Sequence, residues 1–363
     1  MSSDFGKNLK VSVFGQSHSA AIGAVLDGLP AGYAVDTAQL QAFADRRRAK
    51  DGLSTARREE DRIEIVSGLF EGKTCGAPLA LFIKNGDVRS SDYAEIDKRP
   101  RPSHADYTSY AKYGWRDYRG GGHFSGRLTA ALCAAGGVAK QILENFGVFV
   151  GAHALQIGKV KDAAFDPVRV RREDFVYPTD FPALSAEAAE RMKAEILSAK
   201  SECDSVGGVV ECAVIDLPAG LGEPMFDGVE NRFAANLFGI PAVKGVEFGS
   251  GFAGAALRGS ENNDAFYWDN GAVKTKTNNA GGVNGGIANG MPVVFRAAFK
   301  PTASIFRPQD TVDLEKEENC SLLIRGRHDP CIVVRAVPVV EAVACLTALD
   351  LLLGAKKDAL NAK

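Results

Sequence analysis

The 363-residue chain lacks the features that would mark several classes of protein. Its seven cysteines are odd in number and never spaced C-x-x-C, which argues against a disulfide framework and against a structural zinc site. The formal net charge is only −2, so nucleic acid is not expected as a main partner. A chain with these thiols is expected in the reducing cytoplasm.

Long uninterrupted apolar runs are also scarce. Charged residues interrupt the first ten positions, which are therefore not expected to form a signal peptide. The most apolar stretch, Ala336 to Leu353, contains Glu341 and Asp350 and is expected to fall short of a membrane-spanning helix. No membrane partner is expected.

No Pro/Ser-rich linker divides the chain, so residues 1–363 are expected to form a single domain. One internal echo, "AVLDGLPAG" at Ala24–Gly32 and "AVIDLPAG" at Ala213–Gly220, hints at duplicated halves.

Short β-type runs alternate with helical stretches, which predicts a mixed α/β chain without a regular strand–helix–strand repeat. The predicted strands include "LKVSVFG", "AIGAVLDG", "RIEIVSG", "LALFIK", "VGGVVECAVID" and "VVFRAAF". The predicted helices are Thr37–Arg48, Gly126–Asn145, Ser185–Ser201 and Val339–Gly354.

Nucleotide-binding motifs are either absent or out of context. No G-x-x-x-x-G-K-[ST] is present, which excludes a P-loop. "GSGFAG" at Gly249–Gly254 fits G-x-G-x-x-G, but "RGS" at Arg258–Ser260 breaks the helix that should follow. The match is interpreted as chance.

Glycine is plentiful and clustered. The stretch "RPSHADYTSYAKYGWRDYRGGGHFSGR", Arg101–Arg127, combines histidines, aromatic rings and cations with a triple glycine. A second cluster, "NNAGGVNGGIANG" at Asn278–Gly290, has five glycines in thirteen positions. Such loops permit positive φ and close approach of the backbone to a ligand, although a turn between strands is the simpler explanation of any one of them. With the arginines of "DRRR" at Asp45–Arg48, they favour a small, multiply anionic substrate over a solvated cationic face.

Four of the five histidines stand in polar, turn-like settings and are candidate proton carriers. His153 lies in a predicted strand and is interpreted as packing. Two His/Asp pairs leave a metal-dependent phosphohydrolase open, with ligands His104, Asp106, His328 and Asp329.

Asp350 has two interpretations. In a mostly apolar helix it could be a buried proton-exchanging carboxylate, but Thr347, Asp350, Gly354 and Lys357 share one stripe, which favours a water-facing side.

Long blocks of the sequence, taken in order, resemble the chorismate synthase family. They include "FGQSHSAAIGAVLDGLPAG", "RPSHADYTSYAKYGWRDYRGGG", "PAGLGEPMFDG", "NNAGGVNGGIANG" and "GRHDPCIVVRAVPVVEA", and the resemblance runs from about Leu9 to Leu353. It implies a β-α-β sandwich of antiparallel or mixed sheets around a helical layer, assembled as a homotetramer.

The resemblance also implies an activity. Members convert 5-enolpyruvylshikimate 3-phosphate to chorismate and phosphate in the shikimate pathway, by an anti 1,4-elimination that requires reduced FMN. NADPH is implied as a candidate reductant. The same likeness implies that no metal is needed.

Residue roles are carried over by matching positions. His18 is implied to protonate the departing phosphate, His104 to favour the anionic flavin, and Asp350 to help remove the flavin N5 proton, which reverses the water-facing interpretation. Ser17 and Ser125 are implied to assist the relay. Flavin contacts are implied at His123, Phe124, Ser125, Pro241, Ala242, Gly285, Lys300, Pro301, Thr302, Ala303, Ser304 and Arg327, anion contacts at Arg47, Arg127 and Arg335, and a nicotinamide phosphate contact also at Arg47.

The chain departs from the family pattern at three places. His123-Phe124-Ser125 replaces Arg-Ser-Ser, Gln16 replaces a glutamate, and Pro241 stands where a polar residue is common. The first change removes a cation near the flavin phosphate and is expected to alter cofactor affinity. A flavin- or anion-binding module without catalysis is the non-enzymatic alternative, but such a module would not need His18, His104 and Asp350.

Overall fold

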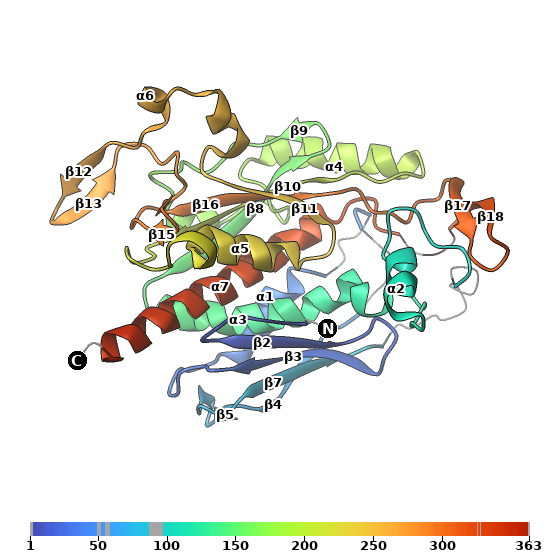
Figure 1. The fold of residues 1–363 in the computed structure, drawn as a ribbon, viewed down its shortest axis with the longest axis horizontal. Coiled ribbons are helices and arrows are strands. Elements are labelled where there is room, and N and C mark those ends of the chain that lie inside the picture. Colours follow the sequence, from blue (N-terminus) through green and yellow to red (C-terminus); the bar gives the residue numbers. More distant parts are fainter. Residues whose placement is uncertain are drawn as a thin grey trace.

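The computed structural model describes residues 3–48, 52–54, 59–86, 97–324, 326 and 328–361, with the side chains of 356–361 left out. Two five-stranded antiparallel sheets enclose a layer of helices (Figure 1). Arg327, one of the implied flavin contacts, lies outside the described residues.

The first sheet is built from the N-terminal part of the chain. Its strand order is β1 (Asp4–Phe5), β2 (Lys10–Gly15), β3 (Ala21–Asp27), β7 (Leu79–Lys84) and β4 (Ile63–Ser67). Along β7 the apolar side chains of Leu79, Leu81 and Ile83 are buried, whereas the residues between them are partly exposed. This alternation is what a strand with one face on the core requires.

The second sheet comes from the rest of the chain. Its order is β11 (Val243–Phe248), β16 (Val293–Phe299), β10 (Gly208–Ile215), β8 (Phe149–Ile157) and β9 (Val160–Lys161). The two segments of the internal echo fall in β3 and β10, the middle strands of their sheets. Duplication of the halves stays a prediction.

Three helices fill the space between the sheets: α1 (Thr37–Asp45), α3 (Thr129–Asn145) and α7 (Val333–Asn361). α3 and α7 cross so closely that a Cβ on Gly136 would lie 2.3 Å from the Cβ of Ala342. α5 (Val229–Phe238) packs against α7 and β11 at one side of this layer (Figure 1). The sandwich predicted from the family resemblance is confirmed.

The remaining helices and short strands lie around this frame. The helices are α2 (Asp106–Tyr113), α4 (Ala186–Ser201) and α6 (Gly259–Asn262). The strands are β5 (Leu69–Phe70), β6 (Lys73–Thr74), β12 (Phe266–Asp269), β13 (Ala272–Thr275), β14 (Val283–Asn284), β15 (Ile287–Ala288), β17 (Gln309–Asp313) and β18 (Glu318–Leu322). The helix after "GSGFAG" is only the four residues of α6, so that segment has no dinucleotide-binding geometry.

α7 differs from the sequence expectation in length. It begins at Val333, and its stretch Val333–Ala355 is long and apolar enough to cross a membrane by length and composition alone. The expectation that this segment falls short of a spanning helix is therefore wrong. Its most apolar window is fully buried within the protein, between the two sheets. Burial explains the apolar composition of α7, because a helix that is covered on all sides is apolar all round.

Candidate functional site

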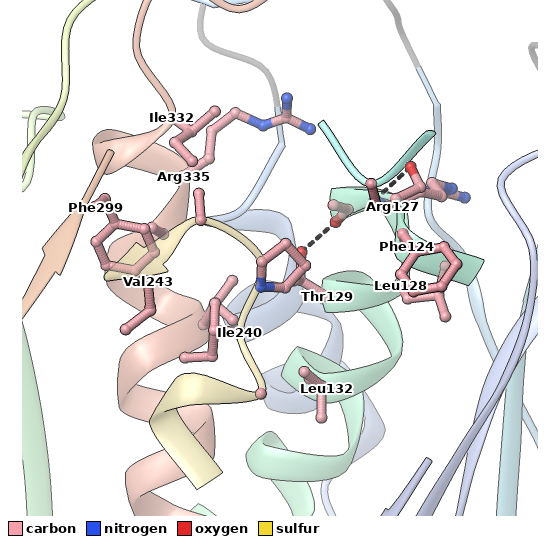
Figure 2. A pocket seen from close by; sticks show the side chains of 18 of the residues that line it. Phe124, Arg127, Leu128, Thr129, Leu132, Ile240, Val243, Phe299, Ile332 and Arg335 are labelled. Carbon is pink, nitrogen blue, oxygen red and sulfur yellow. Dashed lines mark hydrogen bonds between the residues drawn. The ribbon is translucent and has the colours of Figure 1, made fainter. Parts of the chain in front are cut away.

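A cavity of about 940 Å³ opens at the end of the helical layer where α3 and α7 begin. One wall carries Ile240, Val243, Phe299 and Ile332, and the opposite wall carries Phe124, Leu128 and Leu132 (Figure 2). The volume is at the upper end of the range for ligand pockets, roughly 300–1,000 Å³. Apolar walls of this kind suit a flat ring system.

The charge of the cavity is positive. Among the described residues its lining includes seven Lys or Arg side chains and four Asp or Glu side chains, an excess of three cations. The cations are Arg47, Arg48, Arg101, Arg127, Lys244, Lys300 and Arg335, and the carboxylates are Asp4, Glu59, Asp61 and Asp329. An anionic ligand would compensate this excess.

Arg47 and Arg127 share Asp61 beneath the cavity. Arg47 donates to Thr129 Oγ1 at 2.7 Å and to the Gly126 carbonyl at 2.8 Å, and Arg127 forms an ion pair with Asp61. Both arginines are buried. Their side chains are thus held in place before any ligand arrives.

Arg335 stands in the first turn of α7 and bridges two segments. Its Nε donates to the Arg47 carbonyl at 3.1 Å, and one guanidinium nitrogen lies 2.8 Å from Asp329 Oδ2. Burial, reinforced by the charge of Arg335, lowers the pKa of Arg47 to about 10. Burial makes the larger contribution to this lowered pKa, and an anion would relieve the smaller one, which comes from Arg335.

His18 reaches the cavity from the loop between β2 and β3. Its Nδ1 lies 3.1 Å from the Ser17 hydroxyl, which also donates to the Arg119 carbonyl at 3.2 Å. The ring is 9% exposed. Ser17 does not line the cavity; it contacts His18 from behind.

His104 lies just before α2 and also lines the cavity. Its Nδ1 is 2.9 Å from Asp106 Oδ1, and Arg101 donates to the same carboxylate at 2.7 and 3.0 Å. These bonds outweigh burial and hold the pKa of Asp106 well below its usual range. Burial is the largest influence on His104 and lowers its pKa. Asp106 Oδ1 at 2.9 Å is closer to Nδ1 than Arg101 Nη2 at 3.2 Å, which favours a hydrogen on Nδ1 donated to Asp106 and proton uptake at Nε2.

The segment from Lys300 to Ser304 follows β16 and lines the cavity throughout. Lys300 Nζ donates to the Ser103 carbonyl at 2.7 Å, and burial together with the charge of Lys244 lowers the pKa of Lys300. Within the described part of the chain, the buried Thr302 Oγ1 has no hydrogen-bond partner. A buried hydroxyl in this state is suited to a ligand.

The implied contacts at positions 123–125, 241 and 242 all line the cavity as well. His123 bridges Gly15 and Ser3, with 2.8 Å from Nδ1 to the Gly15 carbonyl and 2.8 Å from Nε2 to Ser3 Oγ. His123 stands where the family pattern has an arginine. Both of its ring nitrogens are already bound within the chain, so its position alone does not make it a substitute for that cation. Ser125 Oγ accepts from the Arg127 N–H at 3.2 Å (Figure 2).

Two implied residues lie away from the cavity. Gly285 sits in the β14–β15 turn with φ +61°. Asp350 is seven residues beyond Val343, the last cavity residue of α7, roughly 10 Å further along the helix. Its carboxylate accepts from the backbone N–H groups of Lys7, Asn8 and Leu9. In this chain it anchors the N-terminal segment.

Sequence reasoning gave no cofactor or substrate role to several lining residues. Asp329 and His328 appeared only as metal-ligand candidates, and Asp61 and Arg101 were not singled out. Asp329 is the carboxylate that meets Arg335 in the cavity. The sequence did contain a signal for Asp329: it lies in "GRHDP", directly before an apolar helix. Side chains at the start of a buried helix line the site toward which that helix points.

The candidate metal ligands are not assembled into a metal site among the described residues. No group of three or more His, Cys, Asp and Glu among them is placed to hold an ion. Asp106, one of the four candidate ligands, is bound by Arg101 and His104. His328 has its Nε2 3.4 Å from the Ile324 carbonyl and its ring centroid 4.5 Å from that of Phe306.

Comparison with known proteins completes the description. The profile of a family described as "Chorismate synthase" matches residues 9–353. The chorismate synthase of Korarchaeum cryptofilum is 46% identical, covering 98% of this chain and 99% of that protein. The chorismate synthase of Thermococcus gammatolerans is 49% identical, covering 97% and 98%. A solved "Crystal Structure of Chorismate Synthase" is 28% identical with a TM-score of 0.75, covering 97% of this chain and 93% of that one. The chain therefore belongs to the chorismate synthase family.

Proposed function

We propose that the cavity at the start of α3 and α7 is where this chain carries out the reaction of its family. The chain is a carbon–oxygen lyase of the shikimate pathway, which converts 5-enolpyruvylshikimate 3-phosphate to chorismate and phosphate. The observation that carries the assignment of the site is that apolar walls, an excess of cations and four histidines, His18 and His104 among them, line one cavity. A phosphorylated dicarboxylate needs the cations, and its departing phosphate needs a proton.

The family requires a reduced flavin, which we assign as reduced FMN in the same cavity. The apolar walls suit the ring system, and the partnerless Thr302 hydroxyl offers a hydrogen bond to it. Lys300 and Lys244 supply positive charge for its phosphate. When bound, reduced FMN supplies electron density to the breaking carbon–oxygen bond. NADPH is our proposed reductant. Arg47 would attract the phosphate of NADPH mainly through its charge, because its donors already bind Thr129 and the Gly126 carbonyl.

The protein's own contribution is positioning and proton transfer. Arg127 and Arg335 hold the substrate anions, because both are fixed by carboxylates at the cavity wall. His18 gives a proton to the leaving phosphate, and His104 accepts one at Nε2. Of the two carboxylates Asp329 and Asp350, only Asp329 lines the cavity. Asp329 is therefore better placed to take part in proton transfer.

Assembly and location are part of the same proposal. Several large apolar side chains are largely exposed on the single chain, among them Trp115, Phe226, Phe252 and Trp268. Such exposure supports a homotetramer, in which part of this surface is covered. All seven thiols are free, which supports a cytoplasmic location.

The test is an anaerobic assay of phosphate release from 5-enolpyruvylshikimate 3-phosphate with dithionite-reduced FMN, repeated with FMN and NADPH. We expect turnover in the first assay, and a loss of about 100-fold or more in kcat for His18→Ala with little change in flavin binding. Asp329→Asn should lose activity more than Asp350→Asn. Wild-type turnover in His18→Ala would contradict the role of His18.

The two alternatives make different predictions in the same assay. A metal-dependent phosphohydrolase would release phosphate without flavin and stop in chelator. A flavin-binding module would bind reduced FMN but release no phosphate.

A further inference from the structure

The triple glycine at positions 120–122 lies against His18 and His104, two of the histidines that line the cavity, rather than forming an open anion cradle. A Cβ built on Gly120 would lie 2.4 Å from His18 Cε1 and 2.7 Å from His18 Nδ1. One built on Gly121 would lie 3.5 Å from His104 Cε1, an ordinary contact distance. The turn therefore passes beside both rings. Gly120 has no room for a side chain because of His18, whereas a Cβ on Gly122 would meet the Asp117 carbonyl oxygen at 2.9 Å.

Hydrogen bonds join the same turn to the residue before His18. The Ser17 N–H donates to the Gly122 carbonyl at 3.1 Å, and the Ser17 hydroxyl donates to the Arg119 carbonyl at 3.2 Å. Arg119 is in turn held by Asp117 at 2.7 and 3.0 Å. The turn thus contacts Ser17 through side chain and backbone.

These contacts favour a hydrogen on one particular nitrogen of His18. A carbonyl oxygen can only accept, so the single hydroxyl hydrogen of Ser17 goes to Arg119. The Ser17 oxygen is then an acceptor toward His18 Nδ1, 3.1 Å away. Nδ1 consequently carries a hydrogen in the neutral ring, and Nε2 is the atom that gains and loses a proton.

We propose that the Arg119–Gly122 turn is the positioning element of His18: Gly120 leaves space for the ring, and the Arg119 carbonyl, acting through Ser17, selects the tautomer with hydrogen on Nδ1. Gly120 and Ser17 are thus positioning residues for proton transfer at Nε2. The inference rests on the proposed role of His18, and its test separates the two.

The chain contains a matched control for Gly120. Gly114 has the same φ, +68°, and a Cβ added there meets no atom within 4 Å. Alanine at either position therefore meets the cost of a positive φ, but only Gly120→Ala pushes on His18. We expect Gly114→Ala to keep kcat within about three-fold and Gly120→Ala to lose about 100-fold, the usual effect of a displacement of about 1 Å. The two kcat values are compared at a temperature at which thermal unfolding shows both variants to be folded.

A spectroscopic measurement tests the tautomer without relying on activity. In protein labelled with ¹⁵N-histidine, the His18 signals, assigned by their loss in His18→Gln, should show the hydrogen on Nδ1 above the ring's pKa. Ser17→Ala should shift these signals toward a mixture of tautomers, a change that mere loss of stability would not produce. Gly120→Ala should move them, and Gly114→Ala should not.

The outcomes separate the two proposals. If His18→Ala keeps wild-type turnover, the role of His18 in the reaction fails whatever the glycine variants do. If His18→Ala is inactive but Gly120→Ala matches Gly114→Ala in kcat and in its ¹⁵N signals, the positioning role is overturned. A hydrogen on Nε2 in the wild type would also overturn it. Should Gly120→Ala not fold, the Ser17→Ala spectrum decides.

Discussion

At position 104, burial and a hydrogen bond act on one imidazole in opposite directions. Burial has the larger effect and lowers the pKa of His104, while Asp106 raises it. Asp106 stays ionised although it is buried, because Arg101 and His104 donate hydrogen bonds to it. The result is a fixed carboxylate beside a neutral imidazole at neutral pH. This arrangement needs no rearrangement before His104 can accept a proton.

The lowered pKa values of His104 and His328 predict how stability depends on pH. Both lie below the ordinary 6.5 because of burial, so the unfolded chain binds more protons than the folded chain as the pH falls through 6.5. Their stabilising contribution is present above 6.5 and is lost below it. We expect Tm to fall between pH 7.5 and 5.5 in calorimetry, and to fall less in His104→Gln. Asp106 does not interfere, since its contribution is lost only as the pH falls below its ordinary 3.8. An equally steep profile in His104→Gln would contradict the prediction.

At the scale of elements, the pattern of apolar residues was sufficient for several strands and helices that pack on the core, although α5 and β11 were not predicted. The predicted helix Ser185–Ser201 is observed at Ala186–Ser201, with the Ser185 side chain accepting from the Ala188 N–H. "VVFRAAF" is β16, Val293–Phe299, with the residues on the core side buried. α2 was missed because its Asp106 and Ser109 are buried by polar contacts, which leave no apolar period.

The polar stripe of α7 shows what sequence alone could not give. The polar stripe alone favoured a water-facing side for Thr347 and Asp350, an interpretation that the family resemblance reversed for Asp350. The two residues are 1% and 4% exposed, so the water-facing interpretation is wrong. Asn236 donates to Thr347, and the segment at Lys7–Leu9 covers Asp350. Polar residues on one helix face fit water or a polar partner equally well. Here the partner comes from more than 340 positions away.

The N-terminal anchor predicts the effect of removing Asp350. Asp350→Ala leaves the backbone N–H groups of Lys7–Leu9 without their acceptor and removes one of the two carboxylates that bind Arg232, the other being Asp227. We expect a loss of about 3 kcal/mol or more in the free energy of unfolding, measured with urea, with kcat falling only as the folded fraction falls. Asp350→Asn, which keeps an acceptor oxygen, should lose less. A fully folded Asp350→Ala that has lost turnover would instead support the catalytic role implied by the family resemblance.

At the scale of the whole molecule, the cavity is shared between the two parts of the sandwich. His18, Arg47, His104 and Arg127 come from the part that contains the first sheet, whereas positions 241–244, 300–304 and 329–335 come from the part that contains the second. Individual histidines and arginines could be singled out in the sequence, but their convergence depends on how the sheets are held around α7. The relative placement of the two parts therefore decides whether the site exists.

Glu341 on α7 is the charged residue that ties the two parts together inside the core. It is 3% exposed and binds Arg46 at 2.8 Å and Lys140 at 3.3 Å, both from the first part of the chain. These cations outweigh burial and lower the pKa of Glu341. Glu341→Gln would remove the carboxylate that binds Arg46 and would leave Lys140 with Glu144 alone, so we expect unfolding in urea to show a loss of about 3–5 kcal/mol. The control is Glu190→Gln, which breaks the more exposed pair with Lys193 and should cost less than about 1 kcal/mol. Equal losses in the two variants would mean that the sheets are held by apolar packing alone. A selective loss in Glu341→Gln, with weaker substrate binding in the protein that remains folded, would mean that the buried ion pairs of Glu341 set the geometry of the cavity.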